Sequence, residues 1–389
     1  MNLPRFADVV VVGAGAVGAA CAYFAAQAGL RVAVVDRGAI AGGTSSACEG
    51  NILVSDKEAG PELSLAQYSQ SLWRTELAEF GHLWEFESKG GLVVSAKPGT
   101  QARLTLLAAR QRQAGIGVEL LDAGSLKEYE PHLADGMAGG AFYPQDAQVQ
   151  PMLAAAHLLR LARGMGATVH TSTQVTGFLR RGDRVTGVVT SQGTIAAPAV
   201  VNAAGTWGAA IAGLAGVVVP VLPRKGYVMV TEPLPELVRH KVYAAEYVDN
   251  VASSDAGLQT SPVVEGTRGG TILIGSSRER VGFDKSVNPL VLAGMAGKAI
   301  ALFPFLADVL ALRSYSGFRP YCPDHLPVIG PDPRAPGLWH ACGHEGAGIG
   351  LSVGTGALIA SSLTGATPAM GLAPFAPARF DSLRQEAHA

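Results

Sequence analysis

The chain has 389 residues, of which 48% are hydrophobic and 16% are charged, and its mean hydropathy is +0.25. A chain of this length exceeds the size at which a single hydrophobic core usually stops growing, so two domains are expected. The formal net charge is −1, from 30 basic and 31 acidic residues, which leaves no basic footprint for nucleic acid and excludes that class of partner.

The cysteines and the N-terminal region bear on the cellular compartment. The four cysteines form no C-x-x-C pair and are interpreted as reduced thiols, so a cytoplasmic protein is expected. Residues 1–7 lack the basic segment and cleavable apolar stretch of a signal peptide. The longest apolar region, residues 9–35, is interrupted by glycines and is interpreted as a buried unit rather than a membrane span. Peripheral membrane contact is left open.

The first 90 residues have the pattern of a β-α-β unit. Residues 8–12 are a continuous apolar, β-branched run, typical of a central parallel strand. An Ala-rich helix is expected over residues 16–28 and ends at Gly29. The elements expected next are a strand at 31–35, a Gly/Ser/Thr loop at 42–46 and a helix at 63–86.

Beyond residue 90 the chain is expected to leave this unit twice and to return twice. Alternating apolar residues and turn signals between 218 and 319 predict longer strands of an antiparallel sheet. The other expected elements are strands at 91–95, 167–171, 185–190, 199–205 and 338–342, and helices at 101–113, 151–164 and 350–363. Residues 1–88, 145–220 and 325–389 are therefore assigned to a nucleotide-binding domain, and residues 89–144 and 221–324 to a substrate-binding domain.

The sequence Gly13-Ala-Gly15-Ala-Val-Gly18 is a G-x-G-x-x-G motif in a setting that makes it specific. It follows a predicted strand, opens a predicted helix, and is followed by Asp36 at the end of the next strand, 18 residues past Gly18. Gly13 permits the tight turn, Gly15 lets the backbone approach a pyrophosphate, and Gly18 lets helix and strand pack closely. Free N–H groups at the helix start attract phosphate, and the Asp36 carboxylate can accept hydrogen bonds from ribose. We therefore predict a dinucleotide site.

Three further segments favour FAD over NAD as the dinucleotide. The loop Gly42-Gly-Thr-Ser-Ser46 places hydroxyl groups just after the second strand, where an extended pyrophosphate would meet them. The segment Val200-Val-Asn-Ala-Ala-Gly-Thr-Trp207 is a strand that ends in a small-residue turn, which allows close approach to a planar ring. The segment Gly343-His-Glu-Gly-Ala-Gly-Ile-Gly350 is a second glycine-rich turn before a helix, whose free amides could stabilise negative charge on a reduced flavin.

These motifs, with Gly317-Phe-Arg-Pro320 and Pro323-Asp324, occur in the order in which the D-amino acid oxidase-like superfamily carries them, and the chain resembles that superfamily over nearly its whole length. The superfamily includes glycine oxidase, sarcosine oxidase and D-amino acid dehydrogenase. The resemblance implies an α/β fold, with a Rossmann-type FAD-binding domain and an α+β substrate domain built on a large antiparallel sheet. It also implies an FAD-dependent dehydrogenase or oxidase that acts on CH–NH groups.

Within the superfamily, residues 49–58 and Gly275-Ser-Ser-Arg278 look most like the β subunits of bacterial hydroxyproline dehydrogenases. This likeness implies oxidation of an amino acid or a secondary or cyclic amine to an imine, with D-hydroxyproline, D-proline, sarcosine or glycine as examples. The alternative that it raises is a β subunit of a heteromeric amino acid or opine dehydrogenase, with little activity alone and with partner subunits that carry electrons onward. Sarcosine oxidases attach the flavin to a cysteine, and the matching position here is Gly317, so non-covalent FAD is expected.

The resemblance also assigns the chemistry to particular residues. Arg319 stands where the superfamily places its carboxylate-binding arginine, and a guanidinium suits bidentate recognition of a carboxylate. His344 and Tyr247 are further candidates for the catalytic site, although ordinary packing is as good an account of a tyrosine. His344 and Glu345 have no evident third ligand nearby in sequence, so no metal site is expected. The residues assigned to the cofactor are Gly13, Gly15, Ala16, Val17, Gly18, Asp36, Arg37, Thr44, Ser45, Ser46, Gly50, Asn51, Val175, Ala203, Ala204, Gly205, Trp207, Arg319, Gly343, His344, Glu345, Gly346, Gly348, Ile349 and Gly350.

Overall fold

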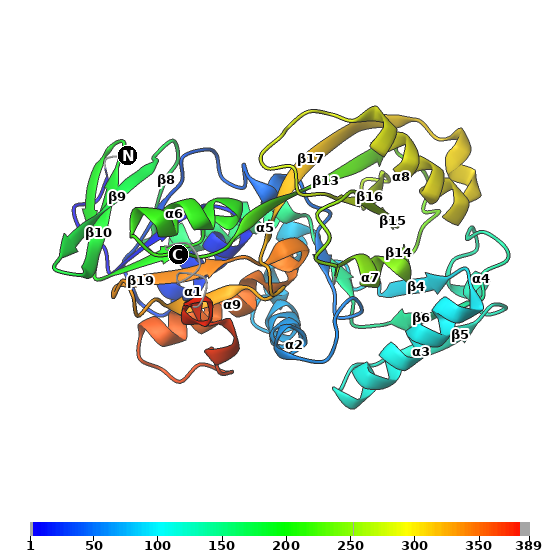
Figure 1. The fold of residues 1–389 in the computed structure, drawn as a ribbon, viewed down its shortest axis with the longest axis horizontal. Helices are drawn as coiled ribbons and strands as arrows, with labels where there is room; N and C mark the ends of the chain where they lie inside the picture. The colour runs from blue at the N-terminus through cyan, green and yellow to red at the C-terminus, as the bar shows by residue number, and fades with distance from the viewer. Residues whose placement is uncertain (1–2, 252, 382–389) are drawn as a thin grey trace.

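A computed structural model describes residues 3–251 and 253–381 of the chain. Figure 1 shows two lobes side by side, one containing both ends of the chain and the other containing helices α3 (Pro98–Gln113) and α8 (Pro289–Leu302). Strands β13 (Leu222–Thr231) and β17 (Ala311–Tyr321) run from one lobe into the other (Figure 1).

The lobe with the chain ends is built on a six-stranded sheet. Its neighbouring strands pair in parallel except for the edge strand β18, which is antiparallel to β19. The strands, in spatial order, are β18 (Val328–Pro331), β19 (Leu338–Cys342), β12 (Ala199–Asn202), β1 (Val9–Val12), β2 (Val32–Val35) and β8 (Thr168–His170). The parallel β1–β12 and β1–β2 pairs confirm the predicted Rossmann-type unit.

Alternation along β1 buries both faces of this sheet. Val9 and Val11 pack toward helices α1 (Ala16–Gln27), α5 (Pro151–Gly164) and α9 (Gly348–Leu363). Val10 and Val12 pack on the opposite face, beneath a three-stranded antiparallel sheet and helix α6 (Gly208–Leu214). That sheet consists of β9 (Val175–Arg181), β10 (Arg184–Thr190) and β11 (Gly193–Ala196). A strand buried on both faces explains the uninterrupted valine run.

The other lobe is built on an eight-stranded sheet. All neighbouring strands pair antiparallel except β14 and β4, which are parallel. The strands, in spatial order, are β17, β13, β16 (Ile272–Arg278), β15 (Gln259–Gly266), β14 (Lys241–Ala244), β4 (Gly91–Ser95), β6 (Gly139–Tyr143) and β5 (Glu119–Asp122). Helix α8 covers one face of this sheet through Met295 and Ala299.

The remaining elements connect and cover the sheets. They are α2 (Pro61–Arg74), α4 (Leu126–Tyr129), α7 (Glu246–Val251), strands β3 (Asn51–Ile52) and β7 (Ala147–Gln148), and the 3-10 turns η1 (Thr44–Ser46), η2 (Ala78–Trp84), η3 (Gly205–Trp207), η4 (Pro304–Asp308), η5 (Glu345–Ala347), η6 (Ala373–Phe375) and η7 (Pro377–Phe380). The strands of the six-stranded sheet all fall within residues 1–88, 145–220 and 325–389, and those of the eight-stranded sheet within 89–144 and 221–324.

Two predicted elements differ from the structure. The single helix expected over residues 63–86 is α2 followed by η2, with a break that lets Trp73 and Trp84 pack edge to face, their ring centroids 5.6 Å apart. The region 218–319, interpreted as strands throughout, also contains helix α8. Its composition is so apolar that no helical period stands out, and only packing against the sheet decides its conformation.

The segment from Glu345 to Leu363 is long and apolar enough to cross a membrane, by length and composition alone. In the structure it is η5 and α9, and the residues from Ile349 to Ala360 are all buried. Helices α1 and α2 both pack against α9, so its apolar surface is covered by the protein itself.

Candidate functional site

A cavity of about 670 Å³ lies where the two lobes meet. Its walls come from the β1–α1 turn, the loop after β2, the turn after β12, strands β13 and β17, and the turn before α9. The predicted site residues that line it are Gly13, Gly15, Ala16, Val17, Asp36, Arg37, Thr44, Ser45, Gly50, Asn51, Val175, Ala203, Ala204, Gly205, Trp207, Tyr247, Arg319, His344, Glu345, Gly346, Gly348 and Ile349. Segments far apart in the sequence thus meet at one cavity.

The β1–α1 turn has the geometry of a phosphate cradle. Gly13 has φ +118°, and a Cβ there would lie 2.4 Å from the Ala203 carbonyl oxygen, so only glycine fits. The Asp36 carboxylate accepts hydrogen bonds from the amides of Ala14 and Gly38, each at 2.7 Å. These bonds fix the carboxylate at the end of β2, beside the cavity, where a ribose hydroxyl could reach it.

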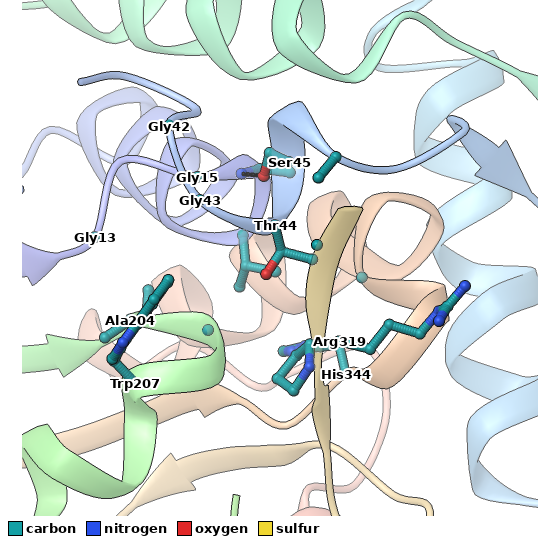
Figure 2. Close-up of a pocket in the computed structure, with 18 of the residues that line it drawn as sticks. Gly13, Gly15, Gly42, Gly43, Thr44, Ser45, Ala204, Trp207, Arg319 and His344 are labelled. Atoms are coloured by element: carbon teal, nitrogen blue, oxygen red, sulfur yellow. Dashed lines mark hydrogen bonds between the residues drawn. The ribbon is translucent and has the colours of Figure 1, made fainter. Parts of the chain in front are cut away.

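The loop after β2 joins this cradle to the other lobe. The Ser45 hydroxyl accepts a hydrogen bond from the Ala16 amide at 3.0 Å, and the Thr44 hydroxyl donates to the Phe318 carbonyl on β17 at 2.7 Å. The Thr206 hydroxyl donates to the same carbonyl, also at 2.7 Å. Figure 2 shows Thr44 and Ser45 between the glycine turn and β17, so this loop forms the middle of the cavity wall.

Trp207 and Val175 border the end of the cavity near Asp36. The Arg37 guanidinium lies 4.2 Å from the centre of the Trp207 ring, and Phe283 stacks on the same ring at 5.5 Å with an interplanar angle of 8°. The backbone segment 173–176 completes this wall, of which only Val175 was predicted.

Four residues assigned to the cofactor do not line the cavity. A Cβ on Gly18 would lie 2.0 Å from the Gly13 carbonyl oxygen, which agrees with the close packing of helix and strand expected at this glycine. Ser46 is exposed, and its hydroxyl donates to the Gly43 carbonyl. Gly343 has φ +78° and packs on Val221, and Gly350 packs on β3. Their assignment to the cofactor stays a prediction.

Arg319 projects from β17 at the far end of the cavity. Figure 2 shows Gly13, Ala204 and Trp207 on one side and the Arg319 guanidinium pointing to the other. Its Nη1 donates to the Ser277 carbonyl at 2.8 Å, and no ion pair joins it to a carboxylate in the described part of the chain. A Cβ at Gly226 would lie 2.2 Å from that Nη1, so glycine makes room for the guanidinium.

Two further arginines lie near Arg319. Arg224 is buried and lies 3.7 Å from the Glu345 carboxylate, which compensates its charge. Burial, with the neighbouring cations Arg319 and Arg224, lowers the pKa of Arg278 to about 10. This end of the cavity therefore carries excess positive charge, which suits an anionic group.

His344 is a neutral wall of the cavity. Burial lowers its pKa to about 3, so the imidazole carries no charge at neutral pH. Its Nε2 lies 3.0 Å from the Thr355 hydroxyl on α9, which fixes the ring. His344 is therefore unsuited to serve as a cation in the site.

Tyr247 lines the cavity, whereas its neighbour Tyr243 does not. The Tyr247 ring lies 5.0 Å from that of Tyr243 and 4.9 Å from the Arg278 guanidinium, so its orientation is fixed from two sides. Tyr243 is fully buried and its hydroxyl donates to Ser55 at 2.6 Å, which makes it part of the core.

The sequence prediction missed Glu49, which lines the cavity and is buried. Its carboxylate lies 3.9 Å from the Lys241 ammonium, which in turn bonds Glu265 at 2.6 Å. Glu49 adjoins the predicted pair Gly50 and Asn51, but Lys241 and Glu265 come from strands distant in sequence. No motif marks them.

The donor set fits a dinucleotide with a planar ring system. A side-chain-free cradle at Gly13 and Gly15, a fixed carboxylate at Asp36 and a far end that contains Arg319 lie along one continuous cavity. A cavity between a Rossmann-type turn and a large, mostly antiparallel sheet is the arrangement expected of a dinucleotide-dependent oxidoreductase.

The chain belongs to the FAD dependent oxidoreductase (DAO) family, whose model matches residues 8–362. It is 30% identical to hydrogen cyanide synthase subunit HcnC of Pseudomonas aeruginosa, over 97% of each chain. It is 33% identical to glycine oxidase of Geobacillus kaustophilus, over 96% of this chain and 97% of the relative.

Solved structures agree with this family. The crystal structure of glycine oxidase from Geobacillus kaustophilus superposes with a TM-score of 0.87 at 29% identity, covering 96% of this chain and 98% of that one. Iminodiacetate oxidase from Chelativorans sp. BNC1 superposes with a TM-score of 0.80 at 25% identity, covering 95% and 98%. The predicted superfamily, fold class and FAD cofactor are confirmed, and this chain is an FAD-dependent oxidoreductase.

Proposed function

We propose that this enzyme oxidises the Cα–N bond of an amino acid, preferably one with a secondary or cyclic amine, to the imine. Amino acids are the substrates named for glycine oxidase, to which the chain is 33% identical. A secondary amine with carboxylates is the substrate named for iminodiacetate oxidase. D-hydroxyproline, D-proline, sarcosine and glycine are the candidates to test first.

The observation that carries the proposal is the Arg319 guanidinium, which lines the same cavity as the dinucleotide cradle and has no carboxylate partner in the described residues. A substrate carboxylate would accept charge-assisted hydrogen bonds from the Arg319 guanidinium and would balance its charge. The bound FAD would supply the acceptor for the hydride that leaves the α-carbon. The protein's own residues hold the carboxylate and surround the reacting carbon with the neutral walls formed by His344, Tyr247 and Ile349.

Anaerobic reduction of the bound flavin tests the proposal directly. The purified holoprotein is mixed with D- and L-proline, D-hydroxyproline, sarcosine, glycine and several primary amino acids, and the loss of the flavin's visible absorbance is followed. At least one secondary or cyclic amino acid should bleach the flavin. Bleaching by amines that lack a carboxylate, with none by amino acids, would overturn the proposal.

A second candidate function is that of a β subunit that passes electrons to a partner. It is supported by the name of HcnC, a synthase subunit, at 30% identity. In that case the reduced flavin should be reoxidised slowly by oxygen and rapidly by an artificial dye acceptor. Fast turnover with oxygen alone would favour an independent oxidase.

A further inference from the structure

Glu49, Lys241 and Glu265 form a buried charged cluster at the cavity, apart from the arginines. Lys241 and Glu265 project from neighbouring strands β14 and β15, while Glu49 precedes β3. The Lys241 ammonium lies 2.6 Å from Glu265 and 3.9 Å from Glu49. All three side chains are buried, and Glu49 is 7% exposed. Burying a charged side chain costs hydration free energy. Such charges are therefore usually paired with another charge or take part in function.

The cluster has one cation for two carboxyl groups. Burial alone would lower the pKa of Lys241, but the carboxylates of Glu265 and Glu49 raise it, so the ammonium stays charged. The short contact pairs Lys241 with Glu265. Glu49 is the carboxylate left without a full counter-charge.

One oxygen of Glu49 is held by the protein and the other is free. Its Oε2 accepts a hydrogen bond from the Asn51 amide at 3.3 Å and faces Lys241. Its Oε1 is buried and has no hydrogen-bond partner among the described residues. A Cβ at Gly275 on β16 would lie 2.0 Å from Oε1, so this glycine leaves room for the carboxylate.

The cavity is therefore bipolar. Arg319, with Arg278 behind it, makes one part positive, and the incompletely compensated Glu49 makes another part negative. An amino acid zwitterion carries the matching charges on its carboxylate and ammonium. A buried, unsatisfied carboxylate oxygen is costly unless a ligand completes it.

We propose that Glu49 binds the amino group of the substrate through its carboxylate and accepts its proton, with Lys241 and Glu265 as positioning residues. The inference rests on the amino acid oxidation proposed above. The substrate ammonium gives one proton to the Glu49 carboxylate and becomes a neutral amine. Its lone pair then forms the C=N bond as the α-hydrogen leaves with two electrons for the oxidised flavin. Glu49 later returns the proton to solvent.

The other titratable groups close to Glu49 do not compete with it for the proton of the substrate amine. Burial, with the charge of Glu49, raises the pKa of the Cys48 thiol to about 12 and raises the pKa of Tyr315 on β17. Both stay neutral over the working pH range, whereas Lys241 stays charged. The Lys241 ammonium donates to Glu265, although burial and the charge of Glu49 raise the pKa of Glu265.

Glu49→Gln tests the proposal, because it keeps the shape and removes the charge. The substrate found by the flavin-reduction panel is used for kinetics, and tetrahydro-2-furoate, the ring-oxygen analogue of proline, is used as a ligand without an amine. At neutral pH, kcat/KM should fall at least 100-fold. The pH at half-maximal kcat/KM should rise by at least one unit, because the amine must lose its proton in solution. The Kd of tetrahydro-2-furoate, from perturbation of the flavin spectrum, should change less than threefold.

Glu49→Asp is the companion variant, because it keeps the charge on a shorter side chain. It should keep the pH profile of the unmodified enzyme while kcat/KM falls. Flavin content and visible spectrum verify that both variants fold. Parallel pH profiles for the unmodified enzyme and Glu49→Gln, or equal losses of affinity for substrate and tetrahydro-2-furoate, would overturn the role of Glu49. If no amino acid reduces the unmodified enzyme, the proposed function itself fails, which is a separate result.

Discussion

Arg319 and Glu49 differ in how far the sequence can reveal them. Arg319 stands in Gly-Phe-Arg-Pro, a segment shared with a known superfamily, and the structure places it at the cavity. Glu49 acquires its significance from Lys241 and Glu265, which reach it only when β14 and β15 pair. An unpaired buried oxygen is a property of three-dimensional packing, so no spacing along the chain could show it.

Arg319→Ala should impair binding of carboxylate substrates while FAD is retained. Hydrogen bonds to charged groups contribute about 1.5–3 kcal/mol each, so KM for the amino acid should rise on the order of 10- to 100-fold or more. Steady-state kinetics and flavin content measure the two effects. Arg313→Ala is the matched control, because Arg313 lies exposed on the same strand and does not line the cavity. Equal kinetics for the two variants would refute the carboxylate role.

At the scale of elements, many strands and helices occur at the predicted residues, but one predicted helix is broken and one apolar helix was missed. Strand β19 and helix α5 occur at the predicted residues. Helix α8 was missed because its sequence, Pro-Leu-Val-Leu-Ala-Gly-Met-Ala, has no polar face to reveal a period. The eight-stranded sheet decides that conformation by burying one side of the helix.

The crossing of α1 and α9 depends on a glycine. A Cβ at Gly356 would lie 2.6 Å from the Ala20 carbonyl carbon, so Gly356→Ala should push the helices apart and destabilise the fold by about 1–3 kcal/mol. Gly294→Ala is the control, since that helical glycine of α8 has nothing within 4 Å of the added Cβ. It should stabilise the fold by up to about 1 kcal/mol, because alanine favours helix. Thermal or urea unfolding should show opposite signs, and equal signs would contradict the packing argument.

The β6–β7 turn carries a buried acid whose ionisation should couple to stability. Burial raises the pKa of Asp146 to about 7, although its hydrogen bonds with Ser55 and the Val54 amide oppose the shift. Because the folded pKa lies above the unfolded value, this group stabilises the fold at low pH, and the contribution is lost progressively as the pH rises from about 4 to about 7.

Asp146→Asn should therefore flatten the dependence of stability on pH. Between about pH 4 and pH 7 the unmodified protein should lose up to about 1.4 kcal/mol per pH unit from this group, and the variant should not. Urea unfolding at pH 4, 5, 6, 7 and 8 measures the difference. Asp122→Asn is the control, because Asp122 is exposed and bonds only locally to Ser125. Parallel curves for Asp146→Asn and the unmodified protein would exclude the coupling.

At the scale of the whole molecule, the cofactor should bridge the lobes without a covalent bond. Gly317 lines the cavity where a Cβ would lie 2.5 Å from the Ala47 Cβ, so this position has neither a thiol nor room for one. Cys48 lines the cavity, but burial raises the pKa of its thiol to about 12, which suppresses the nucleophilic thiolate. We therefore predict that acid precipitation releases the yellow chromophore into the supernatant.

Removal of FAD should also lower stability, because the cavity draws its walls from both lobes and a ligand that binds only the folded state stabilises it. At a free FAD concentration of 100 times Kd the gain is about 2.7 kcal/mol, which should raise Tm by several degrees over the apoprotein. Asp36→Ala removes the carboxylate that we predict to bind the ribose, so the Tm of this variant should respond to FAD only at higher concentrations. A yellow pellet after acid treatment, or a Tm that does not depend on added FAD, would show instead that the flavin is attached or held elsewhere.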